Sequence, residues 1–151
     1  MAARLLIADS AYVLSLTRGG IWVELSRLPG SAQVLLPGVR ALDEGQLEAA
    51  IQVAEDWLGP YAAALQGEVL EVSDVTGRLQ SGFAAALAST ERTWSIESLE
   101  RAFLKVVDLA TGRIPSPHLK GHRAFVADLL LLRELAHHGR LSSVRLISIS
   151  P

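Results

Sequence analysis

The sequence predicts an α/β domain, with α+β as the variant, in which three to four helices pack on one mixed sheet of about five strands. Three short apolar runs rich in branched and aromatic residues open the chain, helical periodicity dominates its middle, and another apolar run closes it. The 151 residues suffice for one core and are too few for two ordinary domains, so 1–151 is expected to be a single domain. Half of the residues are hydrophobic, which excludes a disordered chain.

The N-terminal apolar runs predict an antiparallel meander. They cover residues 5–8, 12–16 and 21–25. Gly19 and Gly20 separate the second run from the third, and glycine supplies the positive φ angles that a tight hairpin turn requires. Beyond this hairpin, a short edge segment of the sheet is expected over residues 33–36, where a proline then stops it.

A helix is predicted to follow the meander. Asp43 can cap its first turn, and Gln46 occupies the capping-box position three residues later. Apolar residues then repeat at helical spacing as far as Gly59-Pro60, which ends or kinks the helix. Residues 68–73 alternate between apolar and polar side chains and therefore predict a strand.

Three more helices are predicted, over residues 79–88, 95–111 and 122–138. Ser95 is the expected N-cap of the second of them, and Gly112 is its expected terminator. The third helix is apolar on nearly every side between residues 124 and 132, so it must be covered on more than one side. A buried strand over residues 144–149 completes the expected fold.

The apolar content is higher than a small soluble domain needs, and this excess predicts self-association. The last helix supplies the expected interface of a homodimer, with Phe125, Leu129 and Leu132 facing the second copy. No complete catalytic motif is present in the sequence. The leading interpretation is therefore a non-catalytic protein-interaction or assembly domain, which can also dock a protein partner.

Four acids occupy places that carry chemistry in other folds. Asp9 follows the first strand, Glu48 lies in the first helix, and Asp74 follows the fourth strand. A meander, a helix and a strand ending in Asp resemble the opening of the ribonuclease-H-like fold. The resemblance implies a divalent-metal-dependent phosphodiesterase or nuclease, with these three carboxylates holding two metal ions. Asp128 is the fourth acid, but its helix precedes the last strand rather than following it.

A basic segment, residues 112–123, offers another alternative. It contains three cations and two histidines but no acid, and it leads into the N-terminus of the last helix, where free N–H groups favour an anion. The predicted anion-binding residues are Arg113, Lys120, His122 and Arg123. They indicate a small-anion or nucleotide binder, whereas the prolines in the segment also fit an ordinary stiff connector.

All four histidines lie within residues 118–138. His118 and His122 have metal-chelating spacing, but no acid lies nearby in the sequence as a third ligand. His137 and His138 are interpreted as last-turn cations that complement a helix C-terminus. Cysteine is absent, which excludes disulfides and thiolate metal sites, and the sequence predicts no metal and no cofactor.

Charge is divided unevenly along the chain. Residues 1–75 carry a net charge of −6 and residues 76–151 a net charge of +4, giving −2 in total. The two halves are expected to attract each other, and the acidic half argues against tight nucleic-acid binding. Because no apolar run approaches the length of a membrane span and no export signal is evident, a cytoplasmic protein is expected.

Overall fold

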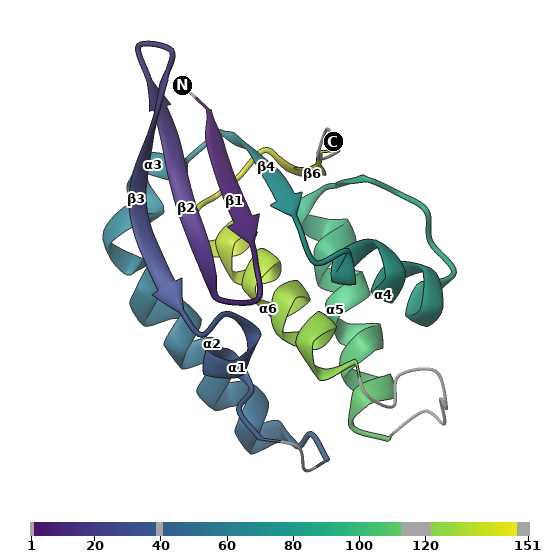
Figure 1. Ribbon diagram of the computed structural model, residues 1–151. Coiled ribbons are helices and arrows are strands. Elements are labelled where there is room, and N and C mark those ends of the chain that lie inside the picture. The colour runs from purple at the N-terminus through teal and green to yellow at the C-terminus, as the bar shows by residue number, and fades with distance from the viewer. Residues whose placement is uncertain (1, 39–40, 113–121, 148–151) are drawn as a thin grey trace.

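The computed structural model describes residues 2–38, 41–112 and 122–147 (Figure 1). The strands are β1 (Ala3–Ile7), β2 (Ala11–Arg18), β3 (Ile21–Pro29), β4 (Val69–Asp74), β5 (Thr93–Trp94) and β6 (Ser143–Leu146). The helices are α1 (Ala32–Leu35), α2 (Glu44–Leu58), α3 (Ala62–Leu65), α4 (Arg78–Leu87), α5 (Ile96–Ala110) and α6 (Arg123–His138), with a 3-10 turn η1 (Gly59–Tyr61) before α3. The predicted α/β class with one mixed sheet is confirmed.

The described strands form one six-stranded sheet in the order β3-β2-β1-β4-β6-β5. The meander β1-β2-β3 is antiparallel, as predicted, whereas β1, β4 and β6 run parallel to one another. Ile7 at the end of β1 lies opposite Asp74 at the end of β4. The carboxyl ends of these two parallel strands therefore meet at one edge of the sheet, which is the edge where the candidate site lies.

Two short elements differ from the prediction. The expected edge segment over residues 33–36 is instead the helix α1, whose Leu35 is buried together with the following Leu36. The two-residue strand β5 pairs with β6 and was not expected. Both elements are shorter than the window in which hydrophobic periodicity separates a helix from a strand, so tertiary packing decides their conformation.

The two predicted N-cap residues cap their helices, but the predicted capping box of α2 does not form. The Asp43 carboxylate accepts a hydrogen bond from the backbone N–H of Gln46 at 2.8 Å, and the Ser95 hydroxyl accepts one from Ser98 N–H at 3.1 Å. The Gln46 side chain does not close the capping box, because it donates to the carbonyl of Ala41 instead. These caps fix where α2 and α5 begin, and both helices then pack against α6.

The helix α6 lies in the middle of the helical layer, between α2 and α5 and behind the sheet (Figure 1). Its own chain covers it on nearly every side. Phe125, Leu129 and Leu132 are at most 1% exposed, so the prediction that they face a second copy is wrong. Phe125 instead packs edge-on against Phe83, with ring centroids 5.5 Å apart.

The many hydrophobic residues of α6 are therefore buried within this chain, by the two neighbouring helices and the sheet. Self-association through another surface stays a prediction. Large exposed apolar side chains occupy three consecutive positions at the start of β3, on Ile21, Trp22 and Val23. None of the helices in the described ranges is long and apolar enough to cross a membrane.

Candidate functional site

The candidate site lies at the carboxyl ends of β1 and β4. After β1 the chain turns through Asp9 into the antiparallel strand β2, and after β4 it leaves the sheet through a short loop into α4. In open α/β sheets, ligands bind outside the carboxyl ends of strands where neighbouring connections diverge in this way. The polar side chains of this edge surround Arg78, which is the first residue of α4.

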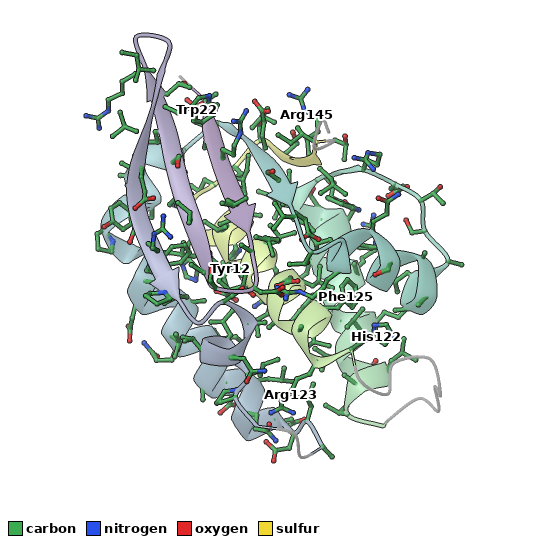
Figure 2. All side chains as sticks on the ribbon, viewed as in Figure 1. Tyr12, Trp22, His122, Arg123, Phe125 and Arg145 are labelled. Atoms are coloured by element: carbon green, nitrogen blue, oxygen red, sulfur yellow. The ribbon has the colours of Figure 1, made fainter. Side chains whose placement is uncertain are left out.

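The buried carboxylate of Asp128 holds Tyr12 and Arg78 in place from the protein interior. It lies on α6 with no exposed surface, and the Tyr12 hydroxyl donates to its Oδ1 at 2.6 Å. Figure 2 shows Tyr12 near the start of β2, next to the turn that follows β1. Arg78 donates to the same carboxylate twice, from Nε to Oδ2 at 2.9 Å and from Nη2 to Oδ1 at 3.1 Å. This two-point contact fixes the plane of the guanidinium group.

Burial governs the electrostatics of these groups. It raises the pKa of Asp128 to about 6, although the hydrogen bonds from Arg78 and Tyr12 oppose the rise. Burial also raises the pKa of Tyr12 far above its ordinary value, and the charge of Asp128 adds to that effect. For Arg78, burial acts to lower the pKa, but the hydrogen bonds and charge of Asp128 outweigh it and raise the pKa. At neutral pH the site therefore holds a neutral phenol, a guanidinium ion and a carboxylate.

The remaining nitrogen of the guanidinium group points outward. Nη1 of Arg78 donates to Asp9 Oδ1 at 3.0 Å, and the Asp9 side chain is 90% exposed. An ion pair with so exposed a partner contributes little to stability and exchanges readily with other anions or with water. Arg78 thus has an inner side held by Asp128 and an outer side available to solvent.

Asp74 organises the loop between β4 and α4. Its Oδ1 accepts hydrogen bonds from the N–H and the hydroxyl of Thr76, and its Oδ2 accepts one from Leu79 N–H at 2.9 Å. The bond from Leu79 satisfies a backbone donor in the first turn of α4, where no side chain caps the helix, and the bonds from Thr76 hold the preceding loop. Asp74 is consequently held in place at the end of β4, close to Arg78.

Ser31 shows backbone strain beside the same guanidinium group. It is 1% exposed, its φ is +51°, and its Oγ lies 3.5 Å from Nη2 of Arg78. A non-glycine residue in this region of φ costs about 1–3 kcal/mol, and such strain is concentrated at functional sites. Ser31 thus combines a strained backbone conformation with a buried hydroxyl group next to Arg78.

The predicted acids are only partly brought together. Asp9 and Asp74 lie at the same sheet edge, where Asp9 forms an ion pair with Arg78 and the charge of Asp74 also acts on Arg78. Glu48 is exposed on α2, and no interaction within the described part of the chain connects it with them. The described residues contain one group of three potential metal ligands within 4.8 Å of one another, and it lies elsewhere. The three acids predicted to hold two metals therefore do not form a metal cage.

The predicted anion-binding segment is only partly described. Arg113 and Lys120 lie outside the described residues, and His122 is the N-cap residue of α6 but provides no side-chain cap. Arg123 donates to the backbone carbonyls of Leu36 at 2.9 Å and Pro37 at 2.8 Å. Its guanidinium group therefore links the start of α6 to the connection between α1 and α2 (Figure 2).

Arg78 and Tyr12 were not predicted as site residues. Tyr12 belongs to an apolar run, so nothing local distinguishes it from a core residue. Arg78 did offer a signal, since a cation in the first turn of a helix opposes the helix dipole and requires a nearby acid to offset it. The sequence does place such an acid four residues before it, at Asp74.

The described chain combines an antiparallel meander with parallel strands that are joined by helical crossovers. No family model matches the sequence, and no curated protein matches it. Among solved structures, three from Aquifex aeolicus share the fold: a "PPX-GPPA enzyme", a "Ppx/GppA phosphatase" of the type II variant, and a member of the "Ppx/GppA protein family". Their TM-scores are 0.70, 0.68 and 0.65, at 9%, 8% and 8% identity.

The superposed regions cover 96% of this chain in each case, but only 52%, 52% and 51% of the three phosphatase-family chains. The chain thus spans about half the length of the structures that it resembles. At this level of identity the likeness establishes the fold, and what these proteins act on enters only as support for a proposal.

Proposed function

We propose that this domain binds a phosphate-bearing small molecule together with a divalent cation at the carboxyl edge of β1 and β4. The fold is shared with one protein described as a phosphatase and another described as an enzyme, which supports the enzyme or nucleotide-binder alternative over an assembly domain. The observation that carries the proposal is the Arg78 guanidinium group, which is held from inside by a buried carboxylate and points Nη1 outward.

The charge of the edge determines which form of phosphate it accepts. Three carboxylates surround one guanidinium group, so the site has a net charge of −2 when all are ionised, and a free phosphate dianion is repelled. A divalent cation removes this repulsion. Mg²⁺ usually binds through one or two carboxylates plus substrate phosphates and keeps several of its waters. A site of this kind needs no three-ligand protein cage.

Asp9 and Asp74 provide the oxygen atoms that suit such a cation. Asp9 is exposed and has one hydrogen bond to exchange, whereas Asp74 is fixed but retains lone pairs beyond those used by its three donors. When bound, the cation supplies charge neutralisation at the phosphate oxygens. If Asp9 bound the cation, Nη1 of Arg78 would be free to donate a hydrogen bond to a phosphate oxygen.

The test is calorimetric titration of the chain with Mg²⁺ and inorganic pyrophosphate, separately and together. Saturable binding is expected only with both present, and Asp9→Asn or Arg78→Lys should weaken it at least about tenfold, which corresponds to 1.4 kcal/mol. Asp56→Asn on α2 and Arg145→Lys on β6 are the matched controls and should change the affinity little. The proposal is wrong if millimolar Mg²⁺ and pyrophosphate give no binding, or if the controls lose it equally.

A further inference from the structure

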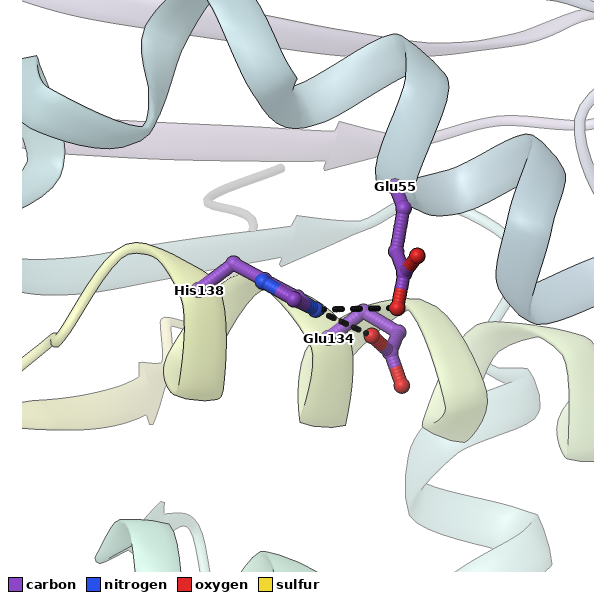
Figure 3. Close-up of side chains that lie close together, drawn as sticks. All are labelled: Glu55, Glu134 and His138. Carbon is purple, nitrogen blue, oxygen red and sulfur yellow. Dashed lines mark hydrogen bonds and ion pairs between the residues drawn. The ribbon is translucent and has the colours of Figure 1, made fainter.

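A second polar cluster lies between α2 and α6, away from the carboxyl edge (Figure 3). Glu134 and His138 are four residues apart on α6 and so share one face of that helix, and Glu55 approaches them from α2. His138 Nε2 lies 3.2 Å from Glu55 Oε1 and 3.0 Å from Glu134 Oε2. His138 is ten residues beyond Asp128, about 15 Å along the helix, so this cluster is separate from the site above.

The charges of the cluster do not balance. Glu134 is 2% exposed, and its Oε1 accepts a hydrogen bond from Arg133 Nη1 at 2.6 Å. Arg133 is shared, however, because it also forms a two-point contact with Glu100 at 2.7 and 3.2 Å. With a neutral imidazole ring, Glu55, Glu100 and Glu134 contribute three negative charges and Arg133 contributes one positive charge, which leaves a net charge of −2. Burying a carboxylate without a full counter-charge is costly, and one divalent cation would cancel the excess.

The hydrogen-bonding capacity of His138 is also exceeded. Its Nε2 carries at most one proton, yet two carboxylate oxygens lie within hydrogen-bonding distance of that one atom. One of the two contacts is therefore poorly satisfied in an ion-pair arrangement. A metal ion bound to the Nε2 lone pair and to both oxygens satisfies all three atoms at once.

The spacing of the three atoms suits a small transition-metal ion. Bonds of about 2.0 Å in tetrahedral geometry place neighbouring ligand atoms about 3.3 Å apart. The two distances from Nε2 fall within a few tenths of an ångström of that value, and all three ligand atoms lie within 4.8 Å of one another. Binding would therefore need only a small movement of the Glu55 side chain, which is partly exposed.

We propose that Glu55, Glu134 and His138 bind one divalent transition-metal ion of the Zn²⁺ type, which links α2 to α6. Glu134 forms the buried floor of the site. The side chains of His138 and Glu55 are 39% and 38% exposed, so the ion enters from solvent and keeps water in its remaining position. A ligand set that includes imidazole favours Zn²⁺ over Mg²⁺ and Ca²⁺, which take oxygen ligands. The two proposed sites therefore differ in the metal ion that they prefer, with Zn²⁺ at this cluster and Mg²⁺ at the carboxyl edge of the sheet.

The test is titration of the metal-free chain with Zn²⁺ at neutral pH, followed by calorimetry. One ion per chain is expected. His138→Gln and Glu55→Gln should each weaken binding at least tenfold, whereas their sequence neighbours His137→Gln and Asp56→Asn should change it less than twofold. Zn²⁺ should also raise the melting temperature of the wild type, since it binds the folded state, but not that of His138→Gln.

Three outcomes would overturn the proposal. These are no saturable Zn²⁺ binding at millimolar metal, binding that survives both His138→Gln and Glu55→Gln, and equal loss in the His137→Gln control. Because Glu55 lies at the surface, Glu55→Gln decides the matter if His138→Gln does not fold, as judged by circular dichroism. Asp9→Asn should leave Zn²⁺ binding unchanged, so failure of this proposal and failure of the phosphate site are distinguishable.

Discussion

Replacing Asp128 with Asn is expected to remove a pH dependence of stability that burial of this carboxyl group creates. Burial raises the pKa of Asp128 from an ordinary value of 3.8 to about 6. In that interval the folded state binds the proton more tightly than the unfolded state does. The stabilisation is therefore complete below about pH 4 and is lost as the pH rises through about 6. The loss is about 3 kcal/mol, because each pKa unit is worth 1.36 kcal/mol.

The assay is urea denaturation of the wild type and Asp128→Asn at a series of pH values between about 4 and about 7. The difference between their unfolding free energies should change by about 2–3 kcal/mol over this range, because the unfolding free energy of the wild type falls relative to that of Asp128→Asn as the pH rises. Other acids cancel in the difference. Glu100 is one of them: its hydrogen bond from Arg133 lowers its pKa, so its contribution is lost in the opposite direction, as the pH falls.

The control is Asp9→Asn, which removes the exposed partner of the same Arg78 and should give a difference that is flat with pH. Parallel curves for the wild type and Asp128→Asn would refute the reasoning. They would mean that the hydrogen bonds from Arg78 and Tyr12 compensate fully for burial. The buried carboxyl group would then carry no cost at neutral pH, and its presence would need no functional explanation.

Three further substitutions test the packing. Gly82→Ala should cost about 1–3 kcal/mol in urea denaturation, since the new Cβ would lie 2.2 Å from the buried ring of Phe125. Ser95→Ala removes the cap of α5 and should cost about 1 kcal/mol, measured in the same way. Arg123→Met removes the donors to two carbonyls between α1 and α2, and should speed hydrogen exchange there before it does so in the core.

Elements with a local chemical signature were predictable from the sequence. Asp43 and Ser95 sit directly before periodic apolar stretches, and the structure uses both as caps. Gly19 and Gly20 both adopt positive φ, at 59° and 79°, in the turn where the sequence placed them. Each of these features depends on a few neighbouring residues, so it can be predicted without knowledge of the tertiary contacts. The helix α1 has no such signature and takes its conformation from its contacts.

The site was only half predictable for the same reason. Acids at the ends of two strands could be recognised, and Asp9 and Asp74 do lie at one edge because β1 and β4 are parallel neighbours. Glu48 could not be judged, since the direction of its side chain depends on how α2 is rotated against α6. Arg78 joins the acids through a contact with Asp128 that spans fifty residues of sequence. Periodicity does not report contacts at that range.

The apolar character of α6 supported the wrong conclusion for a physical reason. A helix without a polar face needs cover on all sides, but the sequence does not say whether its own chain or a second copy provides it. Here α2, α5 and the sheet provide it, and Leu129 and Leu132 have no exposed surface. The high hydrophobic content of α6 reflects its position inside the helical layer, and it does not show whether the protein is a monomer or an oligomer.

The same central position makes the acids of α6 informative. In the described ranges the buried polar or charged residues are Ser31, Asp128 and Glu134, and two of these three lie on this one helix. A buried ion pair is often no more stable than apolar side chains of the same volume, so stability does not account for either acid. Asp128 directs Arg78 toward the sheet edge, and Glu134 faces His138 at the far end of the helix. Each acid is therefore the starting point of one of the two binding proposals, and both proposed sites are built on α6, whose residues are mostly buried.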